Sequence, residues 1–234
     1  AAAATAAAER LITSDKVVAI MGADCSGVTT AIANNVAIPN GVTMISPSAT
    51  SPALSTIADN GYFFRTAPSD ARQGQVLAEI TMERGISEVA VTFTNNDYGK
   101  GLSDSFVSAY KGLGGKVSAI VPHDEGKADY SAEVGALDAS GAEVLAVFGY
   151  VDQGGRHIIQ GSLDSGAFDK FILADGMFGE SLLKNVDGDL SGTFGTVPGT
   201  DSKGADNFAV LAKAAGIKVG GPFTGEAYDA AALL

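Results

Sequence analysis

Cysteine, histidine and tryptophan are scarce in this chain of 234 residues, which has one Cys, two His and no Trp. The single cysteine, Cys25, excludes an intramolecular disulfide and argues against a zinc site built on cysteines. The two histidines, His123 and His157, lie far apart in the sequence, and neither belongs to a recognisable catalytic triad motif. We therefore expect no metal site, no cofactor and no catalytic residues.

Basic residues and long hydrophobic runs are also few. The chain has 15 Lys and Arg against 27 Asp and Glu, a formal net charge of −12. Binding to nucleic acid or to an anionic membrane needs clustered Lys and Arg, so neither is expected as a partner. No apolar run reaches the roughly 20 residues of a transmembrane helix. The Ala-rich segment 1–8 lacks the basic start and apolar centre of a signal peptide.

Short apolar runs alternate with amphipathic segments along the chain. Runs such as Val-Val-Ala-Ile and Val-Leu-Ala-Val-Phe are continuously apolar, which is typical of strands covered on both faces and therefore of a parallel sheet. The many glycines, 30 in all, suit the tight turns of an α/β fold. The expected strands are 16–21, 42–45, 88–94, 116–121, 144–149, 170–173 and 193–197.

Apolar residues at helical spacing lie between these strands. Repeated strand–helix units predict a doubly wound α/β architecture, which by itself does not distinguish a binding protein from an enzyme. The expected helices are 1–12, 70–84, 102–113, 131–139, 153–165, 180–186, 205–215 and 226–234.

Two extended, polar, proline-containing stretches divide the chain. They lie near 65–70 and near 197–201. They predict one lobe made of 1–68 and 198–234, and a second lobe, 69–197, with its own five-stranded sheet. The sequence begins and ends inside helical patterns, so we expect a fragment with truncated ends.

Hydroxyl groups cluster where two expected strands end. Ser46-Pro47-Ser48-Ala49-Thr50 follows the strand 42–45, and Cys25-Ser26-Gly27-Val28-Thr29 follows the strand 16–21. In open α/β sheets ligands bind at the carboxyl ends of strands, and the start of a helix there favours an anionic group. The two segments therefore predict a site for a small carboxylate.

Nine segments together resemble the branched-chain amino-acid binding proteins of ABC importers. The resemblance implies a type I periplasmic binding protein, with two doubly wound, Rossmann-like lobes joined by three crossovers that act as a hinge. The family's first strand–helix–strand unit and its last segment have no counterpart here. The matching segments, in order, are 8–12, 17–22, 25–29, 46–50, 64–70, 96–101, 129–131, 148–150 and 174–176.

In the first lobe, the resemblance implies that a bound amino acid is held by main-chain groups and hydroxyls. The carbonyl of Ser48 would accept from the ammonium, and the hydroxyl and N–H of Thr50 would contact the ligand. Ser26, Gly27 and Thr29 would face the carboxylate, with Ala49 beside them. The family often has a run of hydroxyl residues where Gly27 and Val28 stand, so one donor is lost. Ser26, Ser48 and Thr50 could instead be plain helix caps.

In the second lobe, Asp175 matches the acidic residue that pairs with the ligand ammonium. The family example carries Glu there, so Asp175 reaches about one methylene less. Tyr98 and Tyr150 match tyrosines that line the cleft, where each would offer an apolar wall and one polar tip. The alternatives are an Asp that caps the next helix and two tyrosines packed in the core.

The resemblance implies a solute-binding protein that captures a small amino acid or a related carboxylate between two lobes. It implies a monomer in the periplasm or exported to the cell envelope, with an ABC membrane permease as its partner and no enzymatic activity. An aromatic-acid or amide receptor and a sensory ligand-binding domain of the same fold remain alternatives. A serine hydrolase that uses Ser26 or Ser46 is a less favoured alternative, because a serine nucleophile needs a nearby histidine base and neither serine has an evident one.

Overall fold

The chain folds into two compact units. A computed structural model describes residues 1–199 and 203–234. Unit 1 comprises Ala1–Ser69 and Pro198–Leu234, and unit 2 comprises Asp70–Val197. Two residues of the second predicted boundary, Thr200 and Asp201, lie outside the described residues. Within the described ranges, no helix is both long and apolar enough to cross a membrane.

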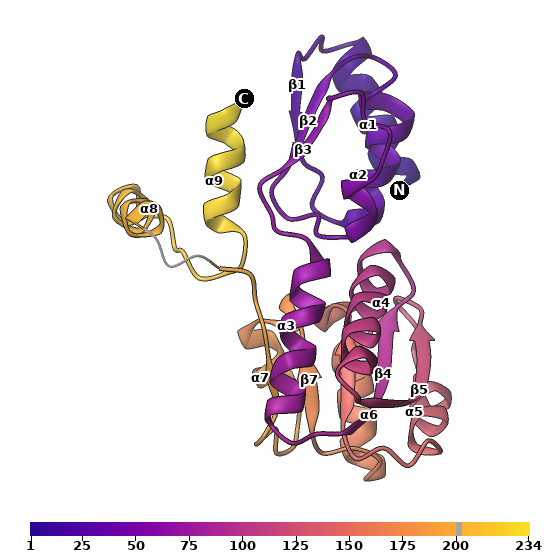
Figure 1. Cartoon of the computed structure of the whole chain (residues 1–234). Helices are drawn as coiled ribbons and strands as arrows, with labels where there is room; N and C mark the ends of the chain where they lie inside the picture. Colours follow the sequence, from indigo (N-terminus) through magenta and orange to yellow (C-terminus); the bar gives the residue numbers. More distant parts are fainter. Residues whose placement is uncertain (200–202) are drawn as a thin grey trace. The chain divides into compact units, whose positions relative to one another are not determined.

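Unit 1 contains a three-stranded parallel sheet in the order β1-β2-β3 (Figure 1). Helices α1 and α2 contribute side chains to a core around Val36, Met44 and Phe63. The bond from Thr66 Oγ1 to the carbonyl of Glu226, 2.7 Å, links this part to the C-terminal helix. The α-helices and strands of unit 1 are α1 (Ala2–Thr13), β1 (Ala19–Met21), α2 (Ser26–Ile32), β2 (Thr43–Ser46), β3 (Phe63–Arg65), α8 (Lys203–Ala214) and α9 (Thr224–Leu233).

Strand β3 was not predicted, because we expected an extended crossing over 64–70. The strand has three residues, and its middle side chain, Phe64, is 51% exposed. Among the described residues it lies at the edge of the sheet and pairs with β2 alone. A short edge strand buries few side chains, so it lacks the apolar run by which the longer strands are found.

Unit 2 contains a five-stranded sheet in the order β5-β4-β6-β7-β8, and every neighbouring pair is parallel. This arrangement confirms the predicted α/β fold with parallel sheets. The helices and strands of unit 2 are α3 (Asp70–Glu83), β4 (Glu88–Thr94), α4 (Asp97–Gly112), β5 (Lys116–His123), α5 (Ser131–Asp138), β6 (Leu145–Phe148), α6 (Gly155–Ser165), β7 (Phe171–Leu173), α7 (Glu180–Asn185) and β8 (Phe194–Gly195).

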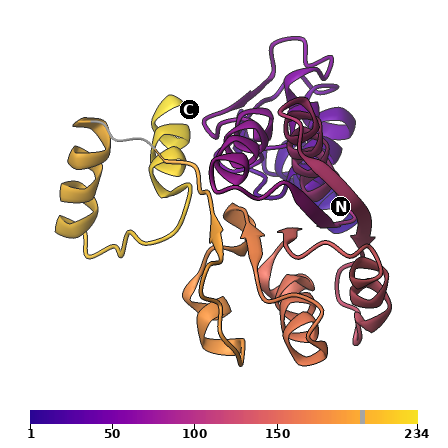
Figure 2. The ribbon, with the colours of Figure 1, turned by 60° about the horizontal axis from the view of Figure 1, so that its bottom comes forward.

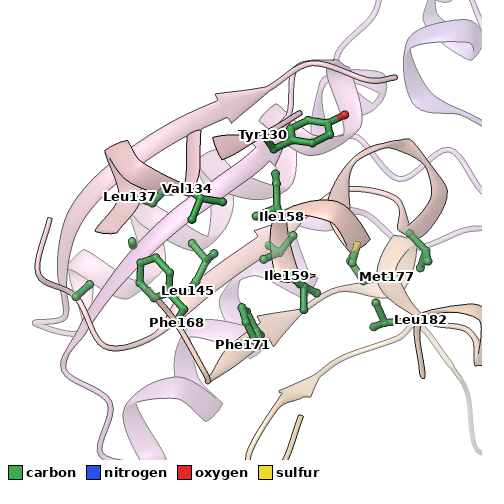
Figure 3. Close-up of a cluster of buried hydrophobic side chains, with 14 residues drawn as sticks. Tyr130, Val134, Leu137, Leu145, Ile158, Ile159, Phe168, Phe171, Met177 and Leu182 are labelled. Carbon is green, nitrogen blue, oxygen red and sulfur yellow. The ribbon is translucent and has the colours of Figure 1, made fainter. Parts of the chain in front are cut away.

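Both faces of this sheet are covered, which explains why its strands are apolar throughout. The helices that follow β5, β6 and β7 lie on one side of the sheet (Figures 1 and 2). Leu145 and Val147 of β6 belong to the core on that side, where side chains from α5 and α6 meet the sheet (Figure 3). Ala146 and Phe148, which alternate with them, belong to the core formed with α3 and α4. The strands are therefore buried on both sides.

Helix α4 begins five residues earlier than predicted. Asn96 is its N-cap and accepts a hydrogen bond from the N–H of Gly99, 2.9 Å away. The two glycines in Tyr98-Gly99-Lys100-Gly101 favoured a turn. Gly99 has a packing role instead, since a Cβ there would lie 2.3 Å from the carbonyl oxygen of Thr94. The helix start therefore sits directly against the end of β4.

Replacing Gly99 with alanine should destabilise unit 2. The new methyl group would meet main-chain atoms of β4, which cannot move aside as a flexible side chain could. Overpacking of this kind costs about 1–3 kcal/mol. Gly112→Ala is the matched control in the same helix, because nothing lies within 4 Å of a Cβ at Gly112. Urea unfolding compares the two, and equal midpoints would contradict the proposed close contact.

Candidate functional site

In unit 1, the loop that follows β2 is held in place by its own hydroxyl groups. Ser46 Oγ donates to the carbonyl of Ala23, 2.6 Å away, and accepts from the N–H of Ala49 at 3.0 Å. Ser48 Oγ donates to Oδ1 of Asp24 at 2.5 Å and lies 3.2 Å from the carbonyl of the same residue. These bonds fix the loop after β2 to the loop after β1.

The side-chain hydroxyls of Ser26 and Thr29 hydrogen-bond to main-chain groups of unit 1 and so stabilise its loops. Both are buried, and Ser26 Oγ accepts from the N–H of Ser51 at 3.1 Å, while Thr29 Oγ1 donates to the carbonyl of Ala23 at 3.1 Å. The N-cap of α2 is Cys25, with no capping side-chain bond. The first N–H groups of a helix have no partner within the helix. A ligand contact from this turn would therefore come from main-chain N–H groups, including that of Gly27.

Arg65 is a residue of this site that the sequence did not single out. From the end of β3, its Nη1 donates to the carbonyls of Ala49 and Ser51, at 3.1 and 2.8 Å. Its Nη2 donates to Ser55 Oγ at 2.6 Å. The guanidinium thus holds the loop from the side of the neighbouring strand, and the sequence shows Arg65 only as part of the predicted crossing.

A small set of polar groups on this loop has no partner among the described residues: the carbonyl of Ser48, and the N–H and hydroxyl of Thr50. Thr50 is 1% exposed. These groups are therefore free to contact a ligand. The set offers one acceptor and two donors. Ala49 differs, because both of its main-chain groups are already bonded.

In unit 2, Asp175 lies just after β7 in a short 3-10 helix, Asp175–Met177. Its side chain is almost completely buried, with the residue 7% exposed. Tyr98 Oη donates to Oδ1 of Asp175 at 3.0 Å and accepts from the N–H of Gly176 at 3.1 Å. The side chain of Gln73, in α3, also favours the ionised form of this carboxylate. Residues from α3, α4 and the end of β7 therefore meet at one carboxylate.

Burial raises the pKa of Asp175, although the hydrogen bond from Tyr98 and the side chain of Gln73 partly counter it. Burial and the nearby carboxylates of Asp175 and Asp70 likewise hold the pKa of Tyr98 well above its usual value. No cationic side chain pairs with Asp175 among the described residues. The described surroundings of Asp175 thus supply hydrogen bonds for a carboxylate but no opposite charge.

Tyr150 forms a wall beside this carboxylate. Its ring stacks on that of Tyr98, with centroids 5.0 Å apart and planes at 30°. It follows β6, whose end is packed tightly against the turn of Asp175, because a Cβ on Gly176 would lie 2.3 Å from the carbonyl of Gly149. The three unit 2 residues of the predicted site, Tyr98, Tyr150 and Asp175, therefore lie together.

The buried histidine of unit 2 is structural. Nδ1 of His123 lies 2.8 Å from Thr92 Oγ1, and Nε2 lies 3.0 Å from Thr94 Oγ1. Desolvation lowers the pKa of His123 to about 4. The hydroxyls of Ser26 and Ser46 bond to main-chain groups, so neither forms a Ser–His pair among the described residues. No group of three or more His, Cys, Asp or Glu in the described ranges could hold a metal ion.

The whole chain, residues 1–234, matches the family described as periplasmic binding protein. The chain belongs to the periplasmic binding protein family. This confirms the resemblance found in the sequence. The family is one of binding proteins and not of enzymes, in agreement with the prediction of a non-enzymatic chain.

This member of the periplasmic binding protein family matches two curated relatives over only part of their length. An amino acid binding protein of Pseudomonas aeruginosa is 30% identical over 186 residues, which is 79% of this chain and 49% of the relative. A Leu/Ile/Val-binding protein homolog of Brucella melitensis is 34% identical over 149 residues, 62% of this chain and 39% of the relative. The chain thus spans about half, or less, of these relatives.

Solved structures of the family share the fold of this chain. A leucine-binding protein LivK from Thermotoga maritima matches with a TM-score of 0.86 and 26% identity, covering 98% of this chain and 66% of that one. LivJ from Streptococcus pneumoniae, solved with isoleucine, gives 0.79 and 26%, covering 99% and 67%. A binding protein from R. palustris, solved with 4-hydroxybenzoate, gives 0.81 at 22% identity, covers 99% and 64%, and shows the fold alone.

Proposed function

We propose that this chain is the ligand-binding part of an ABC importer's solute-binding protein and that its ligand is a small α-amino acid. The observation that carries the proposal is Asp175, a buried carboxylate with hydrogen-bond donors around it and no cation among the described residues. A buried charge without a partner is costly. The ammonium of an amino acid is the partner that fits.

Unit 1 supplies groups of complementary chemistry. The carbonyl of Ser48 is an acceptor for the same ammonium, and the N–H and hydroxyl of Thr50 are donors for a carboxylate. We propose that one ligand uses both sets, with the main-chain N–H groups of Ser26 and Gly27 adding to the carboxylate end, since the N–H of Thr29 already donates to the carbonyl of Cys25. Ala49, Tyr98 and Tyr150 then line the site without carrying charge.

A carboxylate ligand without an amino group, such as the 4-hydroxybenzoate bound to the R. palustris protein of similar fold, is the second candidate. The stacked rings of Tyr98 and Tyr150 would suit an aromatic ligand. Such a ligand would leave Asp175 unpaired and would bring a second negative charge into the protein. The surroundings of Asp175 therefore favour the amino acid.

A thermal-shift panel tests the proposal. The ligand-stripped protein is heated with each of the twenty amino acids, with the deaminated analogue of each aliphatic one, and with benzoate and 4-hydroxybenzoate. A ligand that binds only the folded state raises the melting temperature in proportion to ln(1 + [L]/Kd). We expect one or a few amino acids to stabilise the protein and their deaminated analogues to fail. Stabilisation by benzoates alone would replace the first candidate by the second.

Amino-acid binding should weaken in acid. Because the pKa of Asp175 is raised, its carboxylate takes up a proton at a higher pH than an ordinary aspartate. The ammonium must displace that proton, so affinity is full above the raised pKa and falls as the pH drops through it. Calorimetric titrations between pH 8 and pH 5 measure the effect. In Asp175→Asn the residual affinity should not change in this way, and a parallel decline in both proteins would assign it to another group.

We further propose that the ligand-loaded protein delivers its solute to a membrane permease outside the cytoplasm, as a monomer. The family membership of the whole chain supports this proposal. Size-exclusion chromatography with light scattering tests the monomer with and without ligand. A stable dimer in both states would contradict it.

A further inference from the structure

Arg65 binds the main chain on both sides of Thr50. One nitrogen of its guanidinium, Nη1, donates to the carbonyls of Ala49 and Ser51, at 3.1 and 2.8 Å. The other, Nη2, donates to Ser55 Oγ at 2.6 Å. A planar guanidinium holds several N–H groups in fixed directions, so it can make these three bonds at once. The residues before and after Thr50 are therefore fixed to a single cation.

The peptide group between Ala49 and Thr50 joins this cation to the candidate ligand site. Its carbonyl belongs to Ala49 and accepts from Arg65, whereas its N–H belongs to Thr50 and has no partner among the described residues. The peptide bond is trans, so the carbonyl and the N–H point in opposite directions. The N–H of Thr50 therefore points away from the guanidinium, and the anchored carbonyl sets its direction.

The preceding peptide group, between Ser48 and Ala49, is anchored in the opposite sense. Its N–H belongs to Ala49 and donates to Ser46 Oγ at 3.0 Å. Its carbonyl, that of Ser48, has no partner among the described residues. Because both main-chain groups of Ala49 are bonded within unit 1, its two neighbours present one acceptor and one donor. Only the donor, at Thr50, belongs to a peptide group that is bonded to a cation.

The charge of Arg65 makes this donor stronger. A hydrogen bond from a cation to a carbonyl polarises the peptide group, so the N–H at the other end of the group becomes a better donor. A carboxylate gains most from such a donor, because hydrogen bonds to charged groups are stronger than those between neutral groups. The effect is useful in a chain with a net charge of −12, whose overall field repels an anion.

We propose that Arg65 is a positioning residue that makes the site prefer a ligand carboxylate over a neutral group in the same place, such as a carboxamide. It acts through one peptide group, by fixing the direction of the Thr50 N–H and by strengthening this donor. The proposal rests on the proposed function, because it takes Thr50 as the donor to the ligand carboxylate. It applies to an amino acid and equally to a carboxylate without an amino group.

The test changes Arg65 and compares two ligands that differ only at the carboxylate. Arg65→Lys keeps the positive charge but loses the planar fork, and Arg65→Gln removes the charge as well. Arg10→Lys and Arg10→Gln are the matched controls, because Arg10 is an exposed arginine of the same unit, 3.8 Å from Asp15. Calorimetry measures the affinity of each protein for the amino acid with the largest thermal shift and for its α-carboxamide. If only benzoates bind, the pair is benzoate and benzamide.

We expect the wild-type protein to bind the carboxylate about ten-fold or more tightly than the carboxamide. This ratio should fall several-fold in Arg65→Lys, approach one in Arg65→Gln, and stay at the wild-type value in both Arg10 variants. Urea unfolding checks that every variant is folded under the conditions of the titration. An equal loss of affinity for the two ligands in the Arg65 variants would indicate a structural role alone and would overturn the proposal.

Amide hydrogen exchange tests the same residue without a ligand. The N–H of Ala49 donates to Ser46 within the loop, so its exchange rate in the ligand-free protein reports how firmly the loop is held. It should exchange faster in Arg65→Lys than in Arg10→Lys, and equal rates would overturn the proposal. If the wild-type protein binds neither an amino acid nor a benzoate, the proposed function fails, and the exchange rates still decide whether Arg65 holds the loop.

Discussion

Asp175→Asn should weaken the binding of an α-amino acid by about 2–5 kcal/mol, roughly thirty-fold to several-thousand-fold. Asparagine keeps the shape of the side chain and can still accept from Tyr98, so the substitution removes mainly the negative charge. The ligand ammonium would then be buried without an opposite charge. Calorimetric titration against the amino acid that gives the largest thermal shift measures the loss.

The same substitution should not destabilise the ligand-free protein. Since burial raises the pKa of Asp175, the folded state penalises its charge at neutral pH, and asparagine relieves that penalty. Urea unfolding should show equal or greater stability together with the loss of binding. Asp169→Asn, at an exposed position of the same unit, is the control for removing one negative charge. Wild-type affinity in Asp175→Asn would remove Asp175 from the site.

The second prediction is that the buried, neutral His123 makes the folded protein less stable in acid. In the unfolded chain a histidine takes up a proton near pH 6.5, whereas the folded protein resists protonation of His123 until about pH 4. Stability is therefore full above about pH 6.5 and is lost as the pH falls toward 4. The contribution of this one residue is on the order of 3 kcal/mol.

His123→Gln should remove most of this acid sensitivity. Urea midpoints at pH 7 and pH 4.5 are compared for the wild-type protein, for His123→Gln and for His157→Gln, which replaces the exposed histidine. The charges of Glu133 and Asp124 near His123 are common to all three proteins, so the difference between the two variants isolates His123. If both variants lose stability in acid as the wild-type protein does, the buried neutral histidine is not the cause.

The parts of the fold that bury long apolar runs were predictable from the sequence. Strands such as β4 and β6 are apolar on both faces because helices cover both faces, and that pattern by itself indicates a parallel sheet. Strand β3 and the first turn of α4 were missed. Strand β3 is a three-residue edge strand with an exposed side chain, and the first turn of α4 contains Gly99, which packs closely against Thr94.

The site was predictable only in part, since position along a strand does not show what a side chain bonds to. The grouping of Tyr98, Tyr150 and Asp175 agrees with their expected places at strand ends. The hydroxyls of Ser26 and Thr29, by contrast, are used by the main chain of unit 1. Arg65 was not singled out, because the carbonyls to which it donates, those of Ala49 and Ser51, lie 16 and 14 residues away along the chain.

The central claim is that this chain recognises the ammonium group of an amino acid through Asp175. The measurement that tests it most directly is a pair of calorimetric titrations at pH 7.5, one with the amino acid that gives the largest thermal shift and one with the same molecule without its amino group. The proposed site predicts that the amino acid binds and that its deaminated analogue binds at least a hundred-fold more weakly. Equal affinities, or tighter binding of the deaminated analogue, would contradict it.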